Sequence, residues 1–518
     1  MPRILWVDDE IELLQAHILF LQEKGYQVVT ATNGDDAIYQ VKHQDFDLVL
    51  IDEMMPGKDG LTTLNEIKDL YPYLPVIMIT KNEEESLMEE AIGQRIDDYL
   101  TKPVNPSQIL MACKKILDRK NIIEEKRSVQ YANELNQLSL ALMNPLSSEA
   151  WIELALKLFR MDMELDTILD QNFRSILNDH RREANNEFGK FVEKNYGRWV
   201  HTKDASQRPV FSTDIVSNYI IPRLKEGRQV VFLVIDCLRL DQWLSLEPYF
   251  SDWYKIDRQY YYSILPTATP FSRNALFSGL FPEDIEKFYP ELWSLNEDDE
   301  SLNRYEKELL DIQLQRHGLN LKNRLKYVKI MNSDDMRKLE RNLNNYMDAQ
   351  LLSIVVNIVD IIAHSRSDLP ILKEIAPDES AFRSLTRSWF EHSPLFSILR
   401  ELAKTDALIF VTSDHGSVRG LRGTKVIGDR ETSTNLRYKY GRSLKIDPRQ
   451  AVLIKDPKEW RLPKRGLNTT YVFAKEDYYF VYPTNYNKYL NYYKDSFQHG
   501  GISLEEMILP IVRMEGKH

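Results

Sequence analysis

Acidic side chains follow short apolar runs in the first part of the chain. Asp8 and Asp9 come directly after the run Ile4–Val7, and Asp52 comes directly after the run Leu48–Ile51. If such runs are parallel strands of one sheet, their carboxyl ends meet at one edge. Three carboxylates at one edge repel one another unless a divalent cation lies between them, and Mg²⁺ favours carboxylate and water ligands. We therefore predict that these three residues bind one Mg²⁺ ion.

A hydroxyl and an ammonium group follow two later apolar runs. Thr80 ends the run Val76–Thr80, and Lys102 follows a fifth short run. At that edge, one of the carboxylates could attack a phosphoryl donor whose charge Mg²⁺ neutralises. Lys102 would then pair with the new phosphoryl group, and Thr80 would donate a hydrogen bond to it. One acidic residue at a strand end is usually just solvated, but five residues in this order favour a phosphoacceptor site.

Potential metal ligands recur in the second half of the chain. Asp360 and His364 are four positions apart, which places a carboxylate and an imidazole on one face of a helix. Nitrogen and carboxylate ligands without cysteine suit Zn²⁺, with Mn²⁺ as the alternative. The other candidates share positions at strand ends or near the C-terminus, and they are Asp236, Asp414, His415 and His499.

Two threonines lie in the segment Pro266–Asn274, at a turn that enters a predicted helix. Either threonine, Thr267 or Thr269, would be an effective nucleophile if its hydroxyl contacted a metal ion, because the metal lowers the pKa of that hydroxyl. Backbone N–H groups at such a helix start favour a bound anion. Each feature alone has a simpler explanation, such as a helix cap. Together they indicate two metal ions that support in-line displacement at phosphorus.

One local concentration of positive charge extends from Arg419 to Arg442. It follows two of the proposed ligands directly and could line a groove for a phosphate backbone. An equally supported alternative is a solvated loop in which Asp429 and Glu431 balance the cations.

Alternating strands and helices are needed to bring the first set of residues together. Residues 1–118 contain five β-branched apolar runs separated by amphipathic segments. This pattern predicts a flavodoxin-like α/β domain, with helices on both faces of a parallel sheet. Residues 119–206 are charged, helix-periodic and poor in glycine, with one break at Asn144–Pro145. They predict an α-helical bundle that serves as a linker domain.

Residues 207–518 have the pattern of a larger α/β domain. The apolar runs Val230–Ile235 and Ala407–Thr412 are each followed by a candidate ligand, as expected where ligands collect outside the carboxyl ends of strands. Residues 280–350 are polar and helix-periodic, and we interpret them as an insertion or lid.

Composition limits the classes of function. The chain has 518 residues, 43% of them hydrophobic and 28% charged, which is typical of several globular domains. A net charge of −11 argues against binding to duplex DNA. The only cysteines, Cys113 and Cys237, indicate neither a disulfide framework nor a cysteine zinc site. No apolar run approaches the ~20 residues of a membrane helix, and no signal peptide is apparent, so we expect a cytoplasmic protein without membrane insertion.

The first 118 residues resemble the receiver domain family of two-component systems, on the order of Asp8, Asp9, Asp52, Thr80 and Lys102. The resemblance implies that Asp52 is phosphorylated by a cognate sensor histidine kinase. It also implies that Tyr99 is the switch aromatic beside Thr80 and Lys102, and that the Lys102–Pro103 bond is cis.

Residues 207–518 resemble the PglZ-type branch of the alkaline phosphatase superfamily. The resemblance rests on the segments around Thr269, on Thr412–Gly416 and on the ending His499–Pro510. It implies that Asp360, His364 and His499 hold one Zn²⁺ and that Asp236, Asp414 and His415 hold the other. It also implies that Thr269 is the catalytic nucleophile, with Thr267 as the runner-up. Threonine cannot become formylglycine, which argues against a sulfatase. The candidates for binding substrate are Arg273, Asn274 and Arg437.

The order of receiver, helical linker and PglZ-type domain is similar to that of the PorX-like response regulators. This resemblance implies dimerisation on phosphorylation and a zinc-dependent phosphodiesterase that acts on oligonucleotides, including cyclic ones. It also implies a role in type IX secretion and gliding, with contacts to a sigma factor or a secretion component. Two alternatives stay open at this point, a metal-stabilised signalling adaptor without catalysis and a phosphomonoesterase or phosphosugar mutase.

Overall fold

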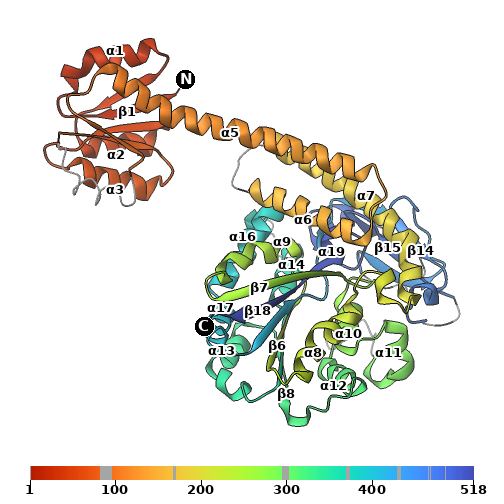
Figure 1. The fold of residues 1–518 in the computed structure, drawn as a ribbon. Coiled ribbons are helices and arrows are strands. Elements are labelled where there is room, and N and C mark those ends of the chain that lie inside the picture. The colour runs from red at the N-terminus through yellow and green to blue at the C-terminus, as the bar shows by residue number, and fades with distance from the viewer. Residues whose placement is uncertain are drawn as a thin grey trace. The chain divides into compact units, whose positions relative to one another are not determined.

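A computed structural model describes residues 2–81, 96–166, 171–293, 303–368, 374–428, 433, 435–464, 466, 468–484 and 486–517 (Figure 1). The chain divides into two compact units, Met1–Glu134 and Leu135–His518. We call them the N-terminal unit and the C-terminal unit and describe each by itself.

The N-terminal unit is built on a parallel sheet. Its described strands lie in the order β2-β1-β3-β4-β5, which is the flavodoxin-like order, so the predicted fold is confirmed. The strands are β1 (Arg3–Val7), β2 (Gln27–Ala31), β3 (Leu48–Asp52), β4 (Val76–Thr80) and β5 (Asp98–Thr101), and the helices are α1 (Gln15–Glu23), α2 (Gly34–His43), α3 (Gly60–Leu70) and α5 (Pro106–Leu142).

Local sequence explains where these helices begin. The side chain of Asn33 accepts a hydrogen bond from the Asp36 N–H at the start of α2, and Asp59 does the same for Thr62 at the start of α3. Alternate strand residues point to opposite faces of the sheet, so each face has its own buried cluster. These elements hold the carboxyl ends of β1 and β3 side by side.

Three helices in the described part of the chain form the linker. They are α5, α6 (Ser148–Glu164) and α7 (Gln171–His201), and the predicted break at Asn144–Pro145 separates the first two. Ser147 caps α6 through the Ala150 N–H. α5 is continuous through residue 118, so no loop separates the predicted receiver from the predicted linker, and the two units also divide within this helix.

A mixed sheet forms the centre of the C-terminal unit. Its described strands lie in the order β7-β18-β10-β6-β9-β8. Strands β10, β6, β9 and β8 are parallel, and β18 runs antiparallel to both of its neighbours, so β7 has the same direction as β10. The larger α/β domain predicted from the sequence is therefore confirmed. The strands are β6 (Val230–Ile235), β7 (Tyr254–Tyr262), β8 (Leu325–Ile330), β9 (Leu351–Val356), β10 (Leu408–Thr412) and β18 (Ile508–Gly516).

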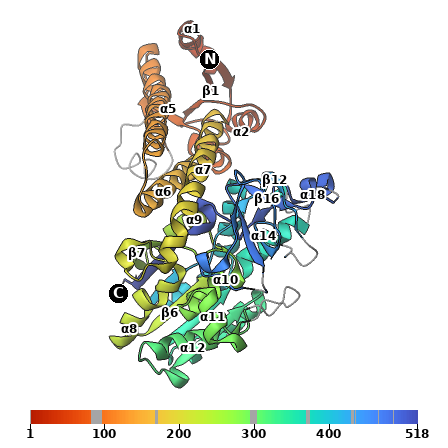
Figure 2. The same cartoon turned by 90° about the vertical axis from the view of Figure 1, so that its right-hand side faces the viewer.

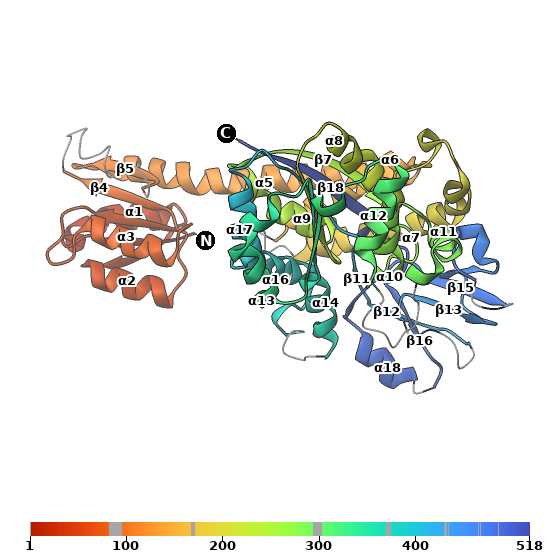
Figure 3. The same ribbon diagram turned by 90° about the horizontal axis from the view of Figure 1, so that it is seen from below.

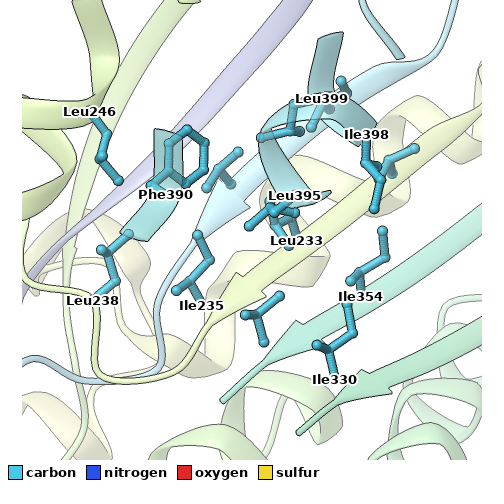
Figure 4. Close-up of a cluster of buried hydrophobic side chains, with 14 of the residues drawn as sticks. Leu233, Ile235, Leu238, Leu246, Ile330, Ile354, Phe390, Leu395, Ile398 and Leu399 are labelled. Atoms are coloured by element: carbon cyan, nitrogen blue, oxygen red, sulfur yellow. The ribbon is translucent and has the colours of Figure 1, made fainter. Parts of the chain in front are cut away.

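Helices cover both faces of this sheet (Figure 3). Figure 4 shows the buried cluster on one face, where Leu233, Ile235 and Ile354 of the strands meet Phe390 and Leu395 of the helices. On that face lie α9 (Leu240–Leu246), α13 (Ser333–Arg341), α14 (Ile358–Asp368), α16 (Glu379–Glu391) and α17 (Pro394–Leu402). On the other face lie α8 (Ile221–Lys225), α10 (Thr269–Ser278), α11 (Pro282–Phe288) and α12 (Glu306–Arg316).

Short sheets and two helices complete the C-terminal unit, coloured in blue shades in Figure 2. One sheet joins β13 (Tyr438–Arg442), β15 (Thr469–Ala474) and β14 (Ala451–Ile454), a second joins β12 (Arg422–Lys425) and β16 (Tyr478–Val481), and a third joins β11 (Val418–Arg419) and β17 (Phe497–Gln498). The helices are α18 (Tyr486–Tyr493) and α19 (Leu504–Met507).

The described part of residues 280–350 is not a lid, because it packs into the core of the C-terminal unit, whereas the interpretation of the segment as an insertion stays a prediction. β8 forms an edge of the central sheet, and Leu309, Leu310 and Leu314 of α12 are fully buried in the core of the unit. The segment has polar helical periodicity because only one side of α12 packs on the core. Residues 294–302 of the expected lid lie outside the described residues.

Within the described ranges, no helix contains a stretch that is both apolar enough and long enough to cross a bilayer. Cys113 and Cys237 are both buried and free, as expected from their separate positions in the sequence.

Candidate functional site

The predicted phosphoacceptor residues lie together at the carboxyl edge of the N-terminal sheet. Asp8 and Asp9 follow β1 and Asp52 ends β3, and ligand atoms of the three carboxylates lie within 4.8 Å of one another. Asp8 and Asp52 are buried, whereas Asp9 is exposed. Lys102 Nζ lies 3.1 Å from Asp8 Oδ2 and 3.0 Å from Asp52 Oδ1. This donor set fits Mg²⁺, which prefers carboxylates and water.

Burial and charge act against each other at this edge. Burial raises the pKa of Asp52, and this effect outweighs the stabilising ammonium group of Lys102. Burial alone would lower the pKa of Lys102, but its contacts with Asp52 and Asp8 raise it above the ordinary lysine value. Lys102 is therefore firmly charged and is the cation nearest to the proposed phosphoryl group.

The proposed switch residues occupy three different environments. The Thr80 hydroxyl donates a hydrogen bond to the Glu53 carboxylate. The Tyr99 ring is 43% exposed, so it is not a packed core residue. The Lys102–Pro103 bond is cis, as the resemblance implied. At Gly60 a Cβ atom would lie 2.3 Å from the Asp52 carbonyl oxygen, so only glycine lets α3 start this close to the phosphoacceptor.

The C-terminal unit brings together all six predicted metal ligands in two triads. Asp236 follows β6, and Asp414 and His415 follow β10, at the carboxyl ends of neighbouring parallel strands. These three form one triad, and all are buried. The second triad consists of Asp360 and His364 on α14 and His499 after β17. Within each triad, one ligand atom of every residue lies within 4.8 Å of the others.

The two triads adjoin through their histidines. The rings of His415 and His499 stack with centroids 4.2 Å apart, and His364 Nε2 lies 2.9 Å from His499 Nε2. Asp360 Oδ1 is buried and accepts no hydrogen bond from any described residue. A buried carboxylate oxygen without a donor fits a metal ligand, since such an atom is otherwise costly. The donors therefore fit two Zn²⁺ ions.

Charge in the first triad is balanced by one guanidinium group. Burial raises the pKa of Asp236 well above its ordinary value, because Arg273 offsets only part of the desolvation and Asp414 adds repulsion. Burial also acts on Asp414, but Arg273 and His415 outweigh it and lower the pKa of that carboxyl group. Arg273 Nε lies 2.9 Å from Asp414 Oδ2, and its Nη2 contacts Asp236.

Burial lowers the pKa of His499 well below the ordinary histidine value, and His415 and His364 add to this effect. A neutral imidazole has a free lone pair, which is the form that binds a metal ion. His499 is thus ready to be a ligand at neutral pH.

Thr269 and Thr267 differ sharply in their surroundings. Thr269 begins α10, and its Oγ1 lies 3.0 Å from His415 Nε2 and 3.4 Å from Asp236 Oδ1. Thr267 is fully buried; its hydroxyl donates to the Gly501 carbonyl and accepts from the Gly500 N–H. Thr269 is therefore placed to react, while Thr267 joins two loops.

The three candidates for binding substrate are buried and have internal partners. Arg273 is 0% exposed, Asn274 2% and Arg437 0%. Asn274 donates to the Pro270 carbonyl, and Arg437 Nε donates to Glu506 at 3.2 Å. These bonds give the three side chains a positioning role, and their contact with substrate stays a prediction.

The start of α10 and the basic stretch also differ from expectation. Pro270 has no N–H, and the N–H groups of Phe271 and Ser272 both donate to the Ala268 carbonyl, so the helix start offers few donors to an anion. In the basic stretch, Arg419 pairs with Asp495 at 2.8 Å and Arg422 pairs with Glu476 and Asp477. These pairs remove the support for a groove that binds a phosphate backbone. Asp429 and Glu431, the proposed counter-charges, lie outside the described residues.

Supporting residues near the site were missed from the sequence. Glu306 is buried, accepts from Arg273 and contacts Tyr327, and the Asn303 side chain donates to the Thr269 carbonyl at 3.1 Å. Both belong to the segment that was interpreted as a lid. Cys237 has a φ of 63°, which turns the chain directly after Asp236. No short motif marks these three residues, since their partners are distant in sequence.

Family models match three consecutive segments of the chain. A model of the BREX system PglZ alkaline phosphatase-like domain matches residues 215–514. A model of the response regulator receiver domain matches residues 4–114, and a model of the PorX response regulator linker domain matches residues 121–200. The first model alone covers more than half of the chain.

Similar proteins of known sequence are named as transcriptional regulatory proteins. The transcriptional regulatory protein ResD of Bacillus subtilis is 34% identical over 117 residues, which is 23% of this chain and 48% of ResD. The transcriptional regulatory protein BaeR of Escherichia coli is 38% identical over 120 residues, 23% of this chain and 49% of BaeR. The chain spans about half the length of these curated relatives.

Similar solved structures cover the same small share of the chain. The response regulator TrrA of Thermotoga maritima, solved with Mg²⁺ and beryllium fluoride, is 34% identical and covers 23% of this chain and 100% of its own, with a TM-score of 0.21. A CheY-like receiver domain protein from Methanospirillum hungatei is 29% identical and covers 23% and 97%, with a TM-score of 0.23.

Proposed function

Since the chain belongs to the PglZ alkaline phosphatase-like family and has the domain order of a PorX-like response regulator, we propose that it is a zinc-dependent phosphoesterase controlled by aspartate phosphorylation. The observation that carries the proposal is the position of Thr269, whose hydroxyl lies 3.0 Å from a ligand nitrogen of the first triad. A purely structural metal site has no need of a hydroxyl at that place.

Each triad would hold one Zn²⁺, and the pair would supply Lewis-acid stabilisation of the attacking and leaving oxygens at phosphorus. Thr269 would attack the phosphorus atom as an alkoxide, and the bond from phosphorus to the leaving alcohol would break. Water would then hydrolyse the phosphorylated threonine and restore its hydroxyl. Asn303 fixes the backbone of Thr269, and Arg273 fixes Asp236 and Asp414, so the nucleophile and the first triad keep one geometry. Preorganisation of this kind lowers the barrier because no side chain has to move during the reaction.

The receiver would supply control. A sensor histidine kinase would donate a phosphoryl group to Asp52, with Mg²⁺ held by Asp8, Asp9 and Asp52. Lys102 lies beside Asp52 to pair with the new charge, and Thr80 would leave Glu53 to bond it. We propose that this rearrangement promotes a homodimer.

For the substrate we propose a phosphodiester of the oligonucleotide class, cyclic forms included. The family resemblance supports this choice, whereas the internally paired arginines of the basic stretch do not add to it. By the same resemblance, the cellular role would be regulation of type IX secretion and gliding, with contacts to a sigma factor or a secretion component.

Hydrolysis of a chromogenic phosphodiester and of the matching monoester by the zinc-loaded full chain tests the proposal. Thr269→Ala should reduce diester hydrolysis at least about a thousandfold, because it removes the nucleophile, while both zinc ions stay bound. Thr470→Ala is the matched control, since its hydroxyl donates to the Gly441 carbonyl in another sheet.

The outcomes separate the alternatives. Loss of activity in Thr269→Ala only, with diester preferred, supports the proposed phosphodiesterase. A preference for the monoester would assign a phosphomonoesterase instead. A chain that binds two zinc ions and hydrolyses neither ester would be a metal-stabilised signalling adaptor.

A further inference from the structure

Helix α7 of the linker lies within the C-terminal unit, beside α19 and β15 in Figure 1. The contacts are not only apolar. Several polar side chains of α7 bond to loops near the metal triads, although the helix itself contributes no metal ligand among the described residues. This raises the question of what these buried polar bonds do.

Tyr196 of α7 holds the loop that leads to the nucleophile. Its ring is 0% exposed, and its Oη accepts a hydrogen bond from the Leu265 N–H at 2.8 Å. Burial raises the pKa of Tyr196, so the phenol stays neutral. Leu265 lies four residues before Thr269, at the start of the turn into α10. No other acceptor bonds the Leu265 N–H in the described structure, so the Tyr196 hydroxyl alone fixes the position of this backbone group.

Asn185 of α7 holds the start of α19, and the loop held by Asn185 means here the turn after His499 together with this short helix. Its Oδ1 accepts from the Leu504 N–H at 2.8 Å, and its Nδ2 donates to Glu505 Oε2 at 3.0 Å. Asn185 is only 4% exposed, so both bonds are made away from water. One side chain thus satisfies a backbone donor and a buried carboxylate of the same loop.

The loop held by Asn185 reaches the first triad through close backbone packing. The Gly416 N–H donates to the Glu506 carbonyl at 3.0 Å, and a Cβ atom on Gly416 would lie 1.9 Å from the Glu505 carbonyl oxygen. Gly416 follows the ligand His415, whose Nδ1 lies 3.0 Å from the Gly416 carbonyl oxygen. A shift of residues 504–506 would therefore be passed directly to His415.

The two loops are also bonded to each other. The Thr267 hydroxyl links to Gly500 and Gly501, and His499 Nδ1 lies 3.3 Å from the Thr267 carbonyl oxygen. Asn185 and Tyr196 lie about three helical turns apart, which brings them to one face of α7. One face of α7 thus anchors two segments that are also bonded to each other, the segment before Thr269 through Tyr196 and the segment after His499 through Asn185.

We propose that α7 is a positioning element of the metal site, with Tyr196 setting the place of Thr269 and Asn185 setting the place of His415. This inference rests on the proposed function, and it assigns to the linker a part in catalysis that its sequence does not suggest. The two residues act through the loops they hold and do not touch the reacting atoms.

The test compares Tyr196→Phe and Asn185→Ala with two matched controls in the zinc-loaded full chain. Tyr254→Phe removes an equally buried hydroxyl that bonds the Leu399 carbonyl, at the sheet edge opposite to the metal triads. Asn195→Ala removes an asparagine of α7 whose bonds stay within the helix. The measurements are kcat, KM, zinc affinity by competition with a chelator, and the thermal midpoint.

We expect Tyr196→Phe to lower kcat about tenfold, with KM and zinc affinity unchanged and a thermal midpoint that matches Tyr254→Phe. We expect Asn185→Ala to weaken the affinity of one zinc ion about tenfold relative to Asn195→Ala. Variants that equal their controls in kcat and zinc affinity would overturn the inference. If the wild-type chain hydrolyses no ester, the proposed function fails, and the zinc affinity of Asn185→Ala still decides whether α7 positions the site.

Discussion

At the scale of single residues, the two triads differ in how strongly they are built into the fold. Asp236, Asp414 and His415 are fully buried and surrounded by fixed partners. His364 is different, because its side chain is 47% exposed and it projects from α14 near the surface. The second triad is therefore the place where one ligand can be removed without disturbing the core.

Replacing His364 by alanine should reduce the zinc content from two ions to one per chain. Three protein ligands are the usual number at a catalytic zinc, and loss of one of three strongly weakens binding. Metal analysis after dialysis against a weak chelator gives the ratio directly. His392→Ala is the control, since that exposed histidine bonds only the Ser388 carbonyl of its own helix. Retention of two ions in His364→Ala would contradict the assignment of the second triad.

Gly416, which follows His415 of the first triad, has no space for a side chain. Gly416→Ala places a Cβ atom 1.9 Å from the Glu505 carbonyl oxygen, and backbone cannot yield as a flexible side chain can. We expect a loss of about 1–3 kcal/mol in the free energy of unfolding, together with weaker zinc binding. Urea unfolding and zinc competition check the two effects. Gly189→Ala is the control, because its new Cβ would meet only the flexible Lys475 side chain at 3.1 Å.

At the scale of elements, a buried ionic network joins the linker helices α6 and α7 to α9 and α16, which cover the central sheet of the C-terminal unit. Arg383 of α16 contacts Asp162 of α6 and Asp241 of α9, with Nη1–Oδ2 distances of 2.6 and 2.8 Å. Arg181 of α7 also pairs with Asp162, at 2.9 Å. These residues are almost without exposure to solvent, apart from Arg181 at 12%. Elements from separate segments are thus held in one arrangement.

Removal of one charge from this network should have an effect that depends on pH. Burial opposes ionisation of Asp162, but Arg181 and Arg383 outweigh it and lower its pKa in the folded chain. A lowered pKa stabilises the fold above the unfolded-state value near 3.9, and this stabilisation is lost as the pH falls toward the folded-state value. Asp162→Asn should therefore lower the free energy of unfolding by about 3 kcal/mol at pH 7. The loss should become smaller as the pH falls below about 4.

Urea unfolding of the wild type and of Asp162→Asn across this pH range measures the difference. Asp179→Asn is the control, because its carboxylate is 70% exposed and pairs only with a neighbour on the same helix. A difference between wild type and Asp162→Asn that stays constant down to pH 3 would show that the Asp162 pairs do not contribute as argued.

The elements that carry ligands were predictable from the sequence, and the reason is local. Apolar runs that end in Asp52, Asp236 or Asp414 mark strands whose carboxyl ends meet, whatever lies elsewhere in the chain. Local patterns could not predict the partner of Arg437, because Glu506 is 69 residues away and no short motif indicates that pair. They failed for α12 as well, where a polar helix conceals one buried face.

At the scale of the whole molecule, a chain of contacts within the C-terminal unit leads from α5 to the metal site. The Ser139 hydroxyl of α5 lies 3.1 Å from His180 Nε2 of α7, and α7 bonds both the start of α19 and the segment before Thr269. α5 begins at Pro106, directly after the segment that carries Lys102. Helix α5 thus begins beside the phosphoacceptor region, and its later part packs on α7, which in turn bonds segments next to the triads.

Beryllium fluoride, which mimics an aspartyl phosphate, should convert the full chain from monomer to dimer and change its rate of phosphodiester hydrolysis. The physical reason is that Lys102 lies 3.0 Å from Asp52 and Thr80 bonds Glu53, so a new phosphoryl group would draw both toward it and remodel the surface beside Tyr99. Light scattering and the esterase assay, each with Mg²⁺, follow the two responses. Asp52→Ala is the control and should show neither, while a change of mass without a change of rate would mean that the receiver controls assembly and leaves the metal site untouched.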